Sequence, residues 1–307
     1  MSSNSRDTGP DGGLSDRDRQ RRALERRLRE ALMQPAEADD AAPEPGDTPP
    51  APGDAAATPR PQADPAIWGR LPRIPVEPRR LDRNLVITAS RHDPAHAAFD
   101  VLRTRIVRAM RDNNWHRVGI TSAGEGNGKS FTAINLAISL SRLSELRTVL
   151  MDMDLRRPGL AKILGLRDMP ATADYLRGEV GTEAYFSTFA PNSFHIGERL
   201  AIGVNGRTDA YAAELFQTEE TGTRLAAMQA ELAADLVLYD LPPALAMDDV
   251  LAFREHLDCA LLVVGGGETR ARELREVQRR LGDDLPILGV VMNKAEVEDD
   301  PGYSYGR

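Results

Sequence analysis

The chain has a single cysteine, Cys259, among its 307 residues. A disulfide within the chain is therefore impossible, which excludes a small secreted scaffold held together by disulfides. Cys259 opens the apolar run of residues 259–264, where a buried thiol behaves as a small apolar side chain. This cysteine usage is typical of the reducing cytoplasm, and we expect a cytoplasmic protein.

Long apolar segments are also absent from the sequence. Crossing a bilayer takes about 20 consecutive apolar residues, and no run of that length occurs. The N-terminus has no apolar h-region, so we expect no signal peptide. The sequence therefore predicts no transmembrane segment, and any recruitment to a membrane would depend on a partner or on a surface helix.

An excess of positive charge is lacking as well. The 39 Lys and Arg residues are outnumbered by 47 Asp and Glu residues, which gives a net charge of −8 and a pI near 5.3. Nucleic-acid binding usually shows as a basic field, so we expect no nucleic-acid partner. A hydrophobic content of 41% and a charged content of 28% suit a globular core with polar additions.

What the sequence does contain begins with an arm of biased composition over residues 1–80, which we expect to be disordered. Arginines and leucines at helical spacing predict a short basic amphipathic helix at about residues 15–33. That helix is either a solvated tail or a docking element for an acidic partner or an anionic membrane. The rest of the arm is a linker rich in Pro and Ala. A folded domain is predicted over residues 81–294, and a flexible acidic tail with tyrosines over residues 295–307.

The feature around which the chain is organised is the run Ala123-Gly124-Glu125-Gly126-Asn127-Gly128-Lys129-Ser130. It follows a strand-like segment at 117–122 and precedes a helical segment at 131–143. Glycines let consecutive N–H groups face one anion, and the helix N-terminus adds positive potential at the same point. Lys129 then neutralises the outer phosphates, and the Ser130 hydroxyl can bind Mg²⁺. The run predicts a P-loop rather than an ordinary glycine-rich turn.

Acidic residues close two further apolar runs. Asp152 and Asp154 follow the run at 147–151, and alternation places both on the same side of the backbone. Asp240 ends the run at 236–240, which is the Walker B pattern for holding Mg²⁺. Solvated turns would be the plainer interpretation, but ligands of open α/β sheets bind where strands end in this way.

Strands and helices alternate through the last third of the folded region. Helical runs at 247–254 and 269–281 are interleaved with strand-like runs at 259–264 and 287–292. This alternation predicts an α/β P-loop NTPase, a mostly parallel sheet with helices on both faces. Trp68 and Leu71, near the end of the arm, are expected to pack onto this domain.

Taken together, these motifs resemble the bacterial tyrosine kinases (BY-kinases) of capsule and exopolysaccharide systems. That family belongs to the partition-type (Par/Min-like) P-loop ATPases, and the resemblance covers about residues 82–307. Gly124 stands where partition ATPases usually carry a signature lysine, and the Asp-Leu-Arg-Arg-Pro run at 154–158 is similar to the kinase branch. The resemblance implies a stand-alone cytoplasmic kinase that is activated by a membrane-spanning polysaccharide chain-length regulator and that self-associates.

The resemblance also implies roles for individual residues, with ATP and Mg²⁺ as cofactors. The implied catalytic residues are Lys129, Asp152, Asp154 and Asp240. The implied nucleotide contacts are Gly124, Glu125, Gly126, Asn127, Gly128, Lys129, Ser130, Phe131 and Asn293. Ser130, Asp152 and Asp240 are the implied metal ligands. Tyr303 and Tyr305 are the implied phosphoacceptors, reached by a neighbouring subunit.

Several positions depart from the family pattern. The ring-assembly motif Glu-x-x-Arg-x-x-Arg is reduced to Ala97, Asp100 and Arg103, so only its last arginine remains. Phe131 and Leu241 replace threonines that follow the P-loop serine and the Walker B aspartate. These departures leave two alternatives open: an ATP-hydrolysing switch of the same system with little tyrosine kinase activity, and a partition-type positioning ATPase.

Overall fold

The computed structural model describes residues 66–84, 86, 94–194, 196–282 and 284–294 of the chain. The helix predicted at 15–33 and the tyrosine tail predicted at 295–307 lie outside these residues. No helix in the described part of the chain is both long enough and apolar enough to cross a membrane.

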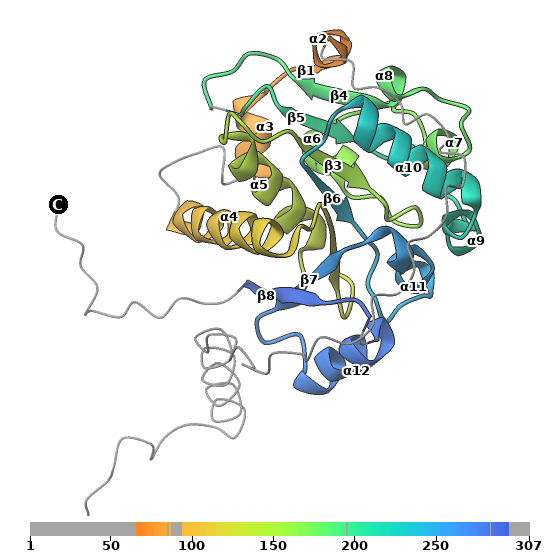
Figure 1. Cartoon of the computed structure of the whole chain (residues 1–307). Helices are drawn as coiled ribbons and strands as arrows, with labels where there is room; N and C mark the ends of the chain where they lie inside the picture. The colour runs from red at the N-terminus through yellow and green to blue at the C-terminus, as the bar shows by residue number, and fades with distance from the viewer. Residues whose placement is uncertain (1–65, 85, 87–93, 195, 283, 295–307) are drawn as a thin grey trace, which may run out of the picture. The chain divides into compact units, whose positions relative to one another are not determined.

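An eight-stranded sheet runs through the described residues, in the order β1-β4-β5-β3-β6-β2-β7-β8 (Figure 1). The strands are β1 (Arg73–Ile74), β2 (Arg117–Ser122), β3 (Thr148–Asp152), β4 (Phe186–Phe189), β5 (Leu200–Gly203), β6 (Leu236–Asp240), β7 (Cys259–Gly265) and β8 (Ile287–Asn293). Every neighbouring pair is parallel except β4 and β5, which are antiparallel. The predicted mostly parallel α/β sheet is confirmed.

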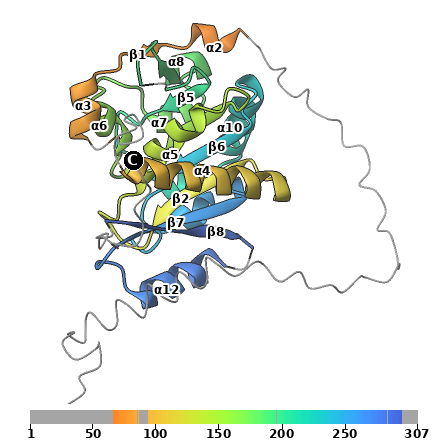
Figure 2. The same cartoon turned by 90° about the vertical axis from the view of Figure 1, so that its left-hand side faces the viewer.

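Helices cover both faces of this sheet (Figures 1 and 2). One face carries α3 (Pro78–Arg83), α4 (Pro94–Asn113), α5 (Lys129–Ser141) and α6 (Leu160–Leu164). The other face carries α2 (Ile67–Arg70), α7 (Thr172–Leu176), α8 (Thr182–Tyr185), α9 (Ala212–Phe216), α10 (Glu219–Glu231), α11 (Asp249–Phe253) with the 3₁₀ turn η2 (Arg254–His256), and α12 (Ala271–Leu281). Two buried clusters result, one on each side of the sheet.

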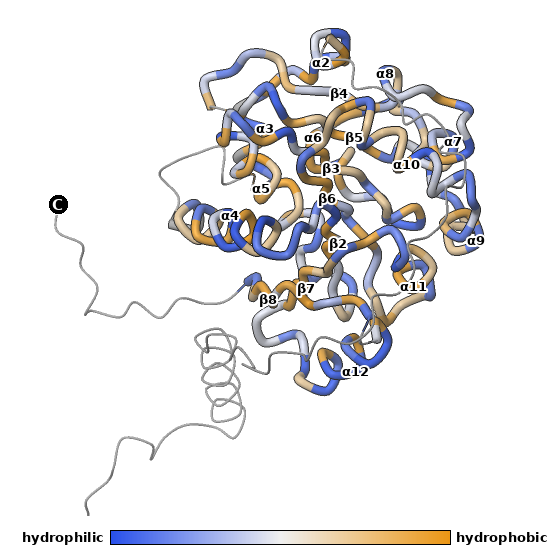
Figure 3. Tube along the Cα trace, in the orientation of Figure 1, coloured by the Kyte–Doolittle hydropathy of each residue, from blue (hydrophilic) through white to orange (hydrophobic). Residues whose placement is uncertain are grey.

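The central strands are mostly apolar because both of their faces are buried, and polar residues stand at their ends (Figure 3). In β3, Val149 and Met151 enter one buried cluster and Leu150 enters the other, as strand alternation requires. The polar residues that the sequence places at strand ends are thereby brought to one edge, the carboxyl edge of the parallel strands.

The fold begins earlier in the chain than residue 81, where the sequence analysis places the domain boundary. The indole N–H of Trp68 donates to the carbonyl of Leu232 at 3.0 Å, and Leu71 is only 2% exposed. Strand β1 pairs with β4. The expected packing of Trp68 and Leu71 is confirmed, and the boundary is corrected. A two-residue strand among prolines is tolerated at a sheet edge, and its composition cannot be told from that of a linker.

Candidate nucleotide and phosphoryl-transfer site

The predicted P-loop connects β2 to α5 and is held in shape by its own side chains. Gly126 and Gly128 have positive φ angles of 74° and 94°, conformations that favour glycine. The backbone N–H of Gly124 donates a hydrogen bond to Oδ1 of Asn127 at 3.1 Å, and this bond links the two ends of the glycine-rich turn. Because α5 begins at Lys129, its free N-terminal amides adjoin the loop, and the arrangement suits an anion.

Asn293, at the end of β8, braces the same loop. Its Nδ2 donates to the carbonyl of Asn127 at 3.1 Å. A Cβ on Gly128 would lie only 1.9 Å from that nitrogen, so this position has no room for a side chain. The structure therefore gives the Asn293 amide a role in supporting the loop, and the predicted contact of Asn293 with the base stays a prediction.

Three predicted carboxylates converge beside the loop. Asp152 and Asp240 stand opposite each other on the paired strands β3 and β6, and both are fully buried. Asp154 is 4% exposed, and its Oδ2 lies 3.6 Å from Nζ of Lys129. The site thus gathers one ammonium group and three carboxyl groups that are distant in sequence, at the edge where α/β proteins bind ligands.

Burial governs the protonation of these carboxyl groups. It raises the pKa of Asp152 well above its usual value, and the neighbouring Asp240 adds to the effect. Burial also raises the pKa of Asp240 to about 6, while the charge of Lys129 and the nearby Ser130 hydroxyl act in the opposite direction. The cluster therefore holds more potential negative charge than one lysine neutralises, which favours the binding of a further cation.

The residues present fit a magnesium ion. Among the described residues, neither carboxylate oxygen of buried Asp240 has a hydrogen-bond partner, so two acceptors are free for a metal or its water. No set of three His, Cys, Asp or Glu side chains in the described chain is arranged to hold a metal alone. Mg²⁺ usually takes one or two carboxylates together with substrate phosphates and water, which matches this composition.

The side chains of two other predicted nucleotide contacts, Glu125 and Phe131, interact with other residues of the protein. Glu125 lies on the exposed side of the loop and forms an ion pair with Arg157. The half-buried ring of Phe131 packs edge-on against Phe99 of α4, with the two ring centroids 6.0 Å apart. The contribution of both residues to nucleotide binding stays a prediction.

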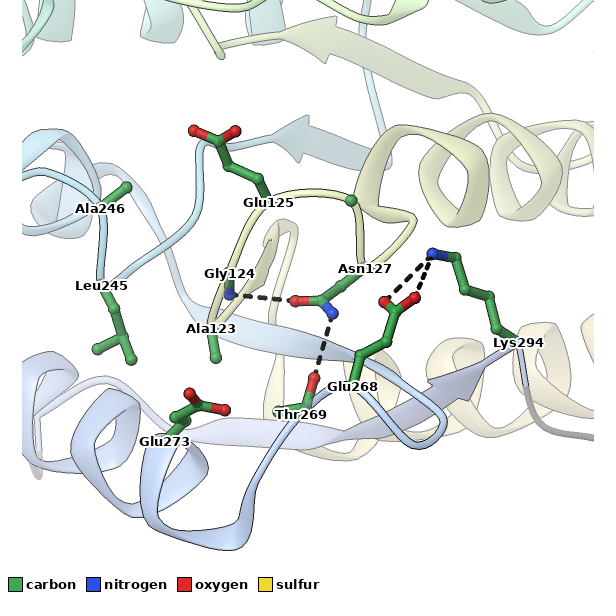
Figure 4. Close-up of a pocket in the computed structure, with 11 residues that line it drawn as sticks. Ala123, Gly124, Glu125, Asn127, Leu245, Ala246, Glu268, Thr269, Glu273 and Lys294 are labelled. Carbon is green, nitrogen blue, oxygen red and sulfur yellow. Dashed lines mark hydrogen bonds and ion pairs between the residues drawn. The ribbon is translucent and has the colours of Figure 1, made fainter.

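The sequence analysis missed a cavity of about 580 Å³ on the α11–α12 side of the loop (Figure 4). Its lining residues are Ala123, Gly124, Glu125, Gly126, Asn127, Leu245, Ala246, Glu268, Thr269, Glu273 and Lys294. Nδ2 of Asn127 donates a hydrogen bond to Oγ1 of Thr269 at 3.2 Å. Glu268 and Lys294 form an ion pair at 2.9 Å. The run of three glycines at 265–267, which begins with the last residue of the buried strand β7, is the sequence signal that could have indicated a loop beside this cavity.

A family model, the CobQ/CobB/MinD/ParA nucleotide binding domain, matches residues 118–302. The chain belongs to this family. A P-loop nucleotide-binding domain is thereby shown, and the loop and acidic cluster described above lie within the matched residues. Within this family, the relatives described next carry the name of tyrosine kinases.

Two relatives illustrate the similarity. The tyrosine-protein kinase YwqD of Bacillus subtilis (strain 168) is 27% identical over 227 residues, which cover 74% of this chain and 92% of YwqD. The tyrosine-protein kinase ptk of Acinetobacter johnsonii is 26% identical over 251 residues, which cover 79% of this chain and 33% of ptk. The chain thus spans nearly all of the first relative and about a third of the second.

Solved kinase domains have the same fold. The VpsO kinase domain is 26% identical, with a TM-score of 0.58 over 70% of this chain and 98% of that domain. The kinase domain of Escherichia coli tyrosine kinase ETK is 25% identical, with a TM-score of 0.61 over 72% of this chain and 84% of that one. The predicted resemblance to the bacterial tyrosine kinases is confirmed.

Proposed function

We propose that the chain is a protein-tyrosine kinase that transfers the γ-phosphoryl group of Mg-ATP to tyrosines in the tail of a second copy, at Tyr303 and Tyr305. One observation carries this proposal: Lys129 and Asp154 lie 3.6 Å apart beside a P-loop, next to a buried Asp240 whose carboxylate oxygens have no hydrogen-bond partner among the described residues. A phosphate-binding cation, a proton acceptor and a metal ligand are what phosphoryl transfer to a hydroxyl requires.

Each residue has a distinct task in this proposal. Lys129 holds the outer phosphates and offsets the charge that gathers on the γ-phosphoryl group. Ser130, Asp152 and Asp240 hold Mg²⁺, which when bound neutralises the charge of the β- and γ-phosphates. A tyrosine hydroxyl has a pKa near 10, so it needs a base as it attacks.

Asp154 is the base in this proposal. Burial raises its pKa, with Lys129 acting against that rise. A carboxylate with a raised pKa accepts a proton more readily at neutral pH than an exposed one. In the described structure the Lys129 ammonium neutralises Asp154, and a phosphate that enters the loop competes for the ammonium and leaves the carboxylate free for the incoming hydroxyl.

We propose further that the kinase regulates exopolysaccharide or capsule polymerisation and export, at the inner face of the membrane, under the control of a membrane-spanning chain-length regulator. The support is the family resemblance of the motifs, together with relatives that are named tyrosine-protein kinase wzc and tyrosine-protein kinase etk. The longer relatives extend well beyond the matched segment, since this chain covers 28–29% of them.

The test uses the purified full chain with Mg-ATP and maps phosphotyrosine by mass spectrometry. Phosphate on Tyr303 or Tyr305 is expected, and it should be lost in Lys129→Met. The Tyr303→Phe/Tyr305→Phe variant should keep ATP hydrolysis while losing those sites. ATP hydrolysis without phosphotyrosine, even with the cytoplasmic segment of the cognate membrane partner added, would replace the proposal with an ATP-hydrolysing switch.

One observation favours that switch as the second candidate. On α4, Arg103 donates from Nη1 to the carbonyl of Ser139 at 3.1 Å, and Asp100 accepts the Ser139 hydroxyl at 2.9 Å. Two of the three positions that correspond to the ring-assembly motif, Asp100 and Arg103, are therefore engaged with α5 of the same chain. A chain that does not assemble a ring has fewer opportunities to modify a neighbour, although it still hydrolyses ATP.

A further inference from the structure

Tyr211 differs from the other tyrosines that the structure describes. Its residue is 68% exposed, whereas Tyr175, Tyr185 and Tyr239 are buried. Burial raises the pKa of the Tyr175 hydroxyl to about 12, and it raises the pKa of Tyr185 well above its usual value. The Tyr185 hydroxyl is also engaged by Thr172 at 2.6 Å. Of the tyrosines in the described part of the chain, Tyr211 is therefore the one whose hydroxyl another molecule can reach.

The backbone of Tyr211 is fixed to the catalytic edge. Its N–H donates to Oδ1 of Asp209 at 2.8 Å, and the N–H of Asp209 donates to the carbonyl of Leu155 at 2.8 Å. Leu155 directly follows Asp154, the proposed base. Asp209 is held in addition by Arg177 at 2.7 Å. Tyr211 thus projects into solvent from a loop that is anchored one residue away from the proposed site of phosphoryl transfer.

The surroundings of Tyr211 suit a transient contact with another protein surface. Tyr211 immediately precedes α9, which packs against α11. Leu251 of α11 and Met247 just before that helix are also exposed, at 36% and 48%. Tyr211 and Leu251 are thus exposed side chains on or beside two helices that pack against each other, α9 and α11.

We propose that Tyr211 is a further phosphoacceptor, modified by the catalytic site of a second copy of this chain. Transfer between copies follows from the geometry, because the loop is fixed and the side chain faces solvent. The hydroxyl oxygen of Tyr211 forms a bond to the γ-phosphorus of ATP in the second copy, and the bond from that phosphorus to the bridging oxygen of ADP breaks. The hydroxyl proton passes to the Asp154 carboxylate of that copy and then to water, and ADP leaves.

The consequence is a change of charge at the catalytic edge. A phosphotyrosine carries a charge of about −1.5 to −2 at neutral pH. It would stand two residues from Asp209, whose carboxylate is paired with Arg177, and three residues from Glu214. Added negative charge on the surface where two copies approach lowers their rate of association. Modification of Tyr211 is therefore expected to slow later phosphoryl transfer to the tail.

The inference rests on the proposed kinase activity, and a mixing experiment separates the two. A tagged Lys129→Met chain serves as acceptor, and an untagged Tyr211→Phe chain serves as enzyme, with Mg-ATP and peptide mapping of the tagged chain. Phosphate on Tyr211 of the acceptor is expected only when the enzyme is present. A tagged Lys129→Met/Tyr211→Phe acceptor is the matched control and should lack that site.

Three other results are informative. Phosphate on Tyr303 or Tyr305 of the acceptor with none on Tyr211 would overturn this inference and leave the proposed kinase function intact. Phosphate on Tyr211 of the wild-type chain alone, absent from the acceptor in the mixture, would overturn transfer between copies. No phosphotyrosine in any chain, with ATP still hydrolysed, would overturn the proposed function itself and this inference with it.

Discussion

Arg156 holds the buried carboxylate of Asp249 through two hydrogen bonds, from Nε to Oδ2 at 2.7 Å and from Nη2 to Oδ1 at 2.9 Å. The pair joins the loop after β3, which carries Asp154, to the first residue of α11, which follows the Asp240 strand. Two segments that contribute acids to the site are therefore fastened to each other. A bidentate pair of this kind fixes orientation as well as charge.

Breaking this pair should destabilise the fold and displace the proposed base. Arg156→Met leaves the Asp249 carboxylate, 1% exposed, without its cation, which should cost about 3 kcal/mol in the free energy of unfolding. Phosphoryl transfer should fall more than nucleotide affinity, because the P-loop itself is unchanged. Urea unfolding and paired measurements of turnover and nucleotide affinity would show this.

The neighbouring Arg157 provides the matched control for Arg156. It pairs with Glu125 at an exposed position, where an ion pair contributes less than about 1 kcal/mol. Arg157→Met should therefore unfold close to the wild type, and Arg156→Met/Asp249→Leu should regain most of the lost stability. Equal losses in Arg156→Met and Arg157→Met would contradict the structural role of the buried pair.

The close approach of Asn293 to Gly128 makes a prediction about the loop. Gly128→Ala adds a Cβ that meets Asn293 Nδ2 at 1.9 Å, in a backbone with φ of 94°, so the apo protein should melt at a lower temperature. Nucleotide affinity should fall by about tenfold or more. Gly124→Ala is the control for melting, since its Cβ meets only Asn127 Oδ1, at 3.6 Å. Unchanged melting of Gly128→Ala would count against the brace.

The buried acids should make the nucleotide-free protein less stable as pH rises. Burial raises the pKa of Asp240 from 3.8 to about 6. The folded state therefore binds its proton more tightly than the unfolded state. Stability gained from that proton is complete below the unfolded pKa and is lost as pH rises through about 6, by on the order of 3 kcal/mol. Asp152, whose pKa is also raised, acts in the same direction.

Urea unfolding between about pH 4 and pH 8, without nucleotide, measures this dependence. Asp240→Asn should give a shallower decline of stability with pH than the wild type, whatever its absolute stability. Parallel curves for the two proteins would show that the Asp240 carboxyl group does not titrate in this range in the folded state.

Trp68 tests where the fold begins. Trp68→Ala should lose about 2 kcal/mol of stability, because the indole packs against the buried cluster around α10. Trp68→Phe keeps the ring and removes the hydrogen bond to Leu232, for a loss of about 1 kcal/mol. Differential scanning calorimetry ranks the three proteins. If Trp68→Ala melted with the wild type, residues before 81 would contribute nothing to the fold.

The sequence predicts those parts of the site that are local in the chain. The P-loop, Asp152 and Asp240 follow from apolar runs that end in characteristic residues, and parallel strands then bring their carboxyl ends together. β4 and β1 were missed because four-residue and two-residue strands carry little periodic signal.

Contacts between distant segments could not be predicted from one sequence. Arg156 and Asp249 are 93 positions apart, and Asn127 and Asn293 are 166 positions apart. Nothing in the residues themselves specifies these pairings. Asn293 illustrates the difference, because the family resemblance implies a nucleotide contact there, which stays a prediction, whereas its hydrogen bond to the Asn127 carbonyl is visible only in the structure.

The most direct test of the central claim compares ATP labelled in the γ-phosphate with ATP labelled in the α-phosphate. The full chain is incubated with each in the presence of Mg²⁺, denatured and treated with alkali, which phosphotyrosine survives. The account predicts that label from the γ-phosphate stays on the wild-type chain, that label from the α-phosphate does not, and that Lys129→Met retains neither. Hydrolysis of ATP with no alkali-stable label on the chain would contradict it.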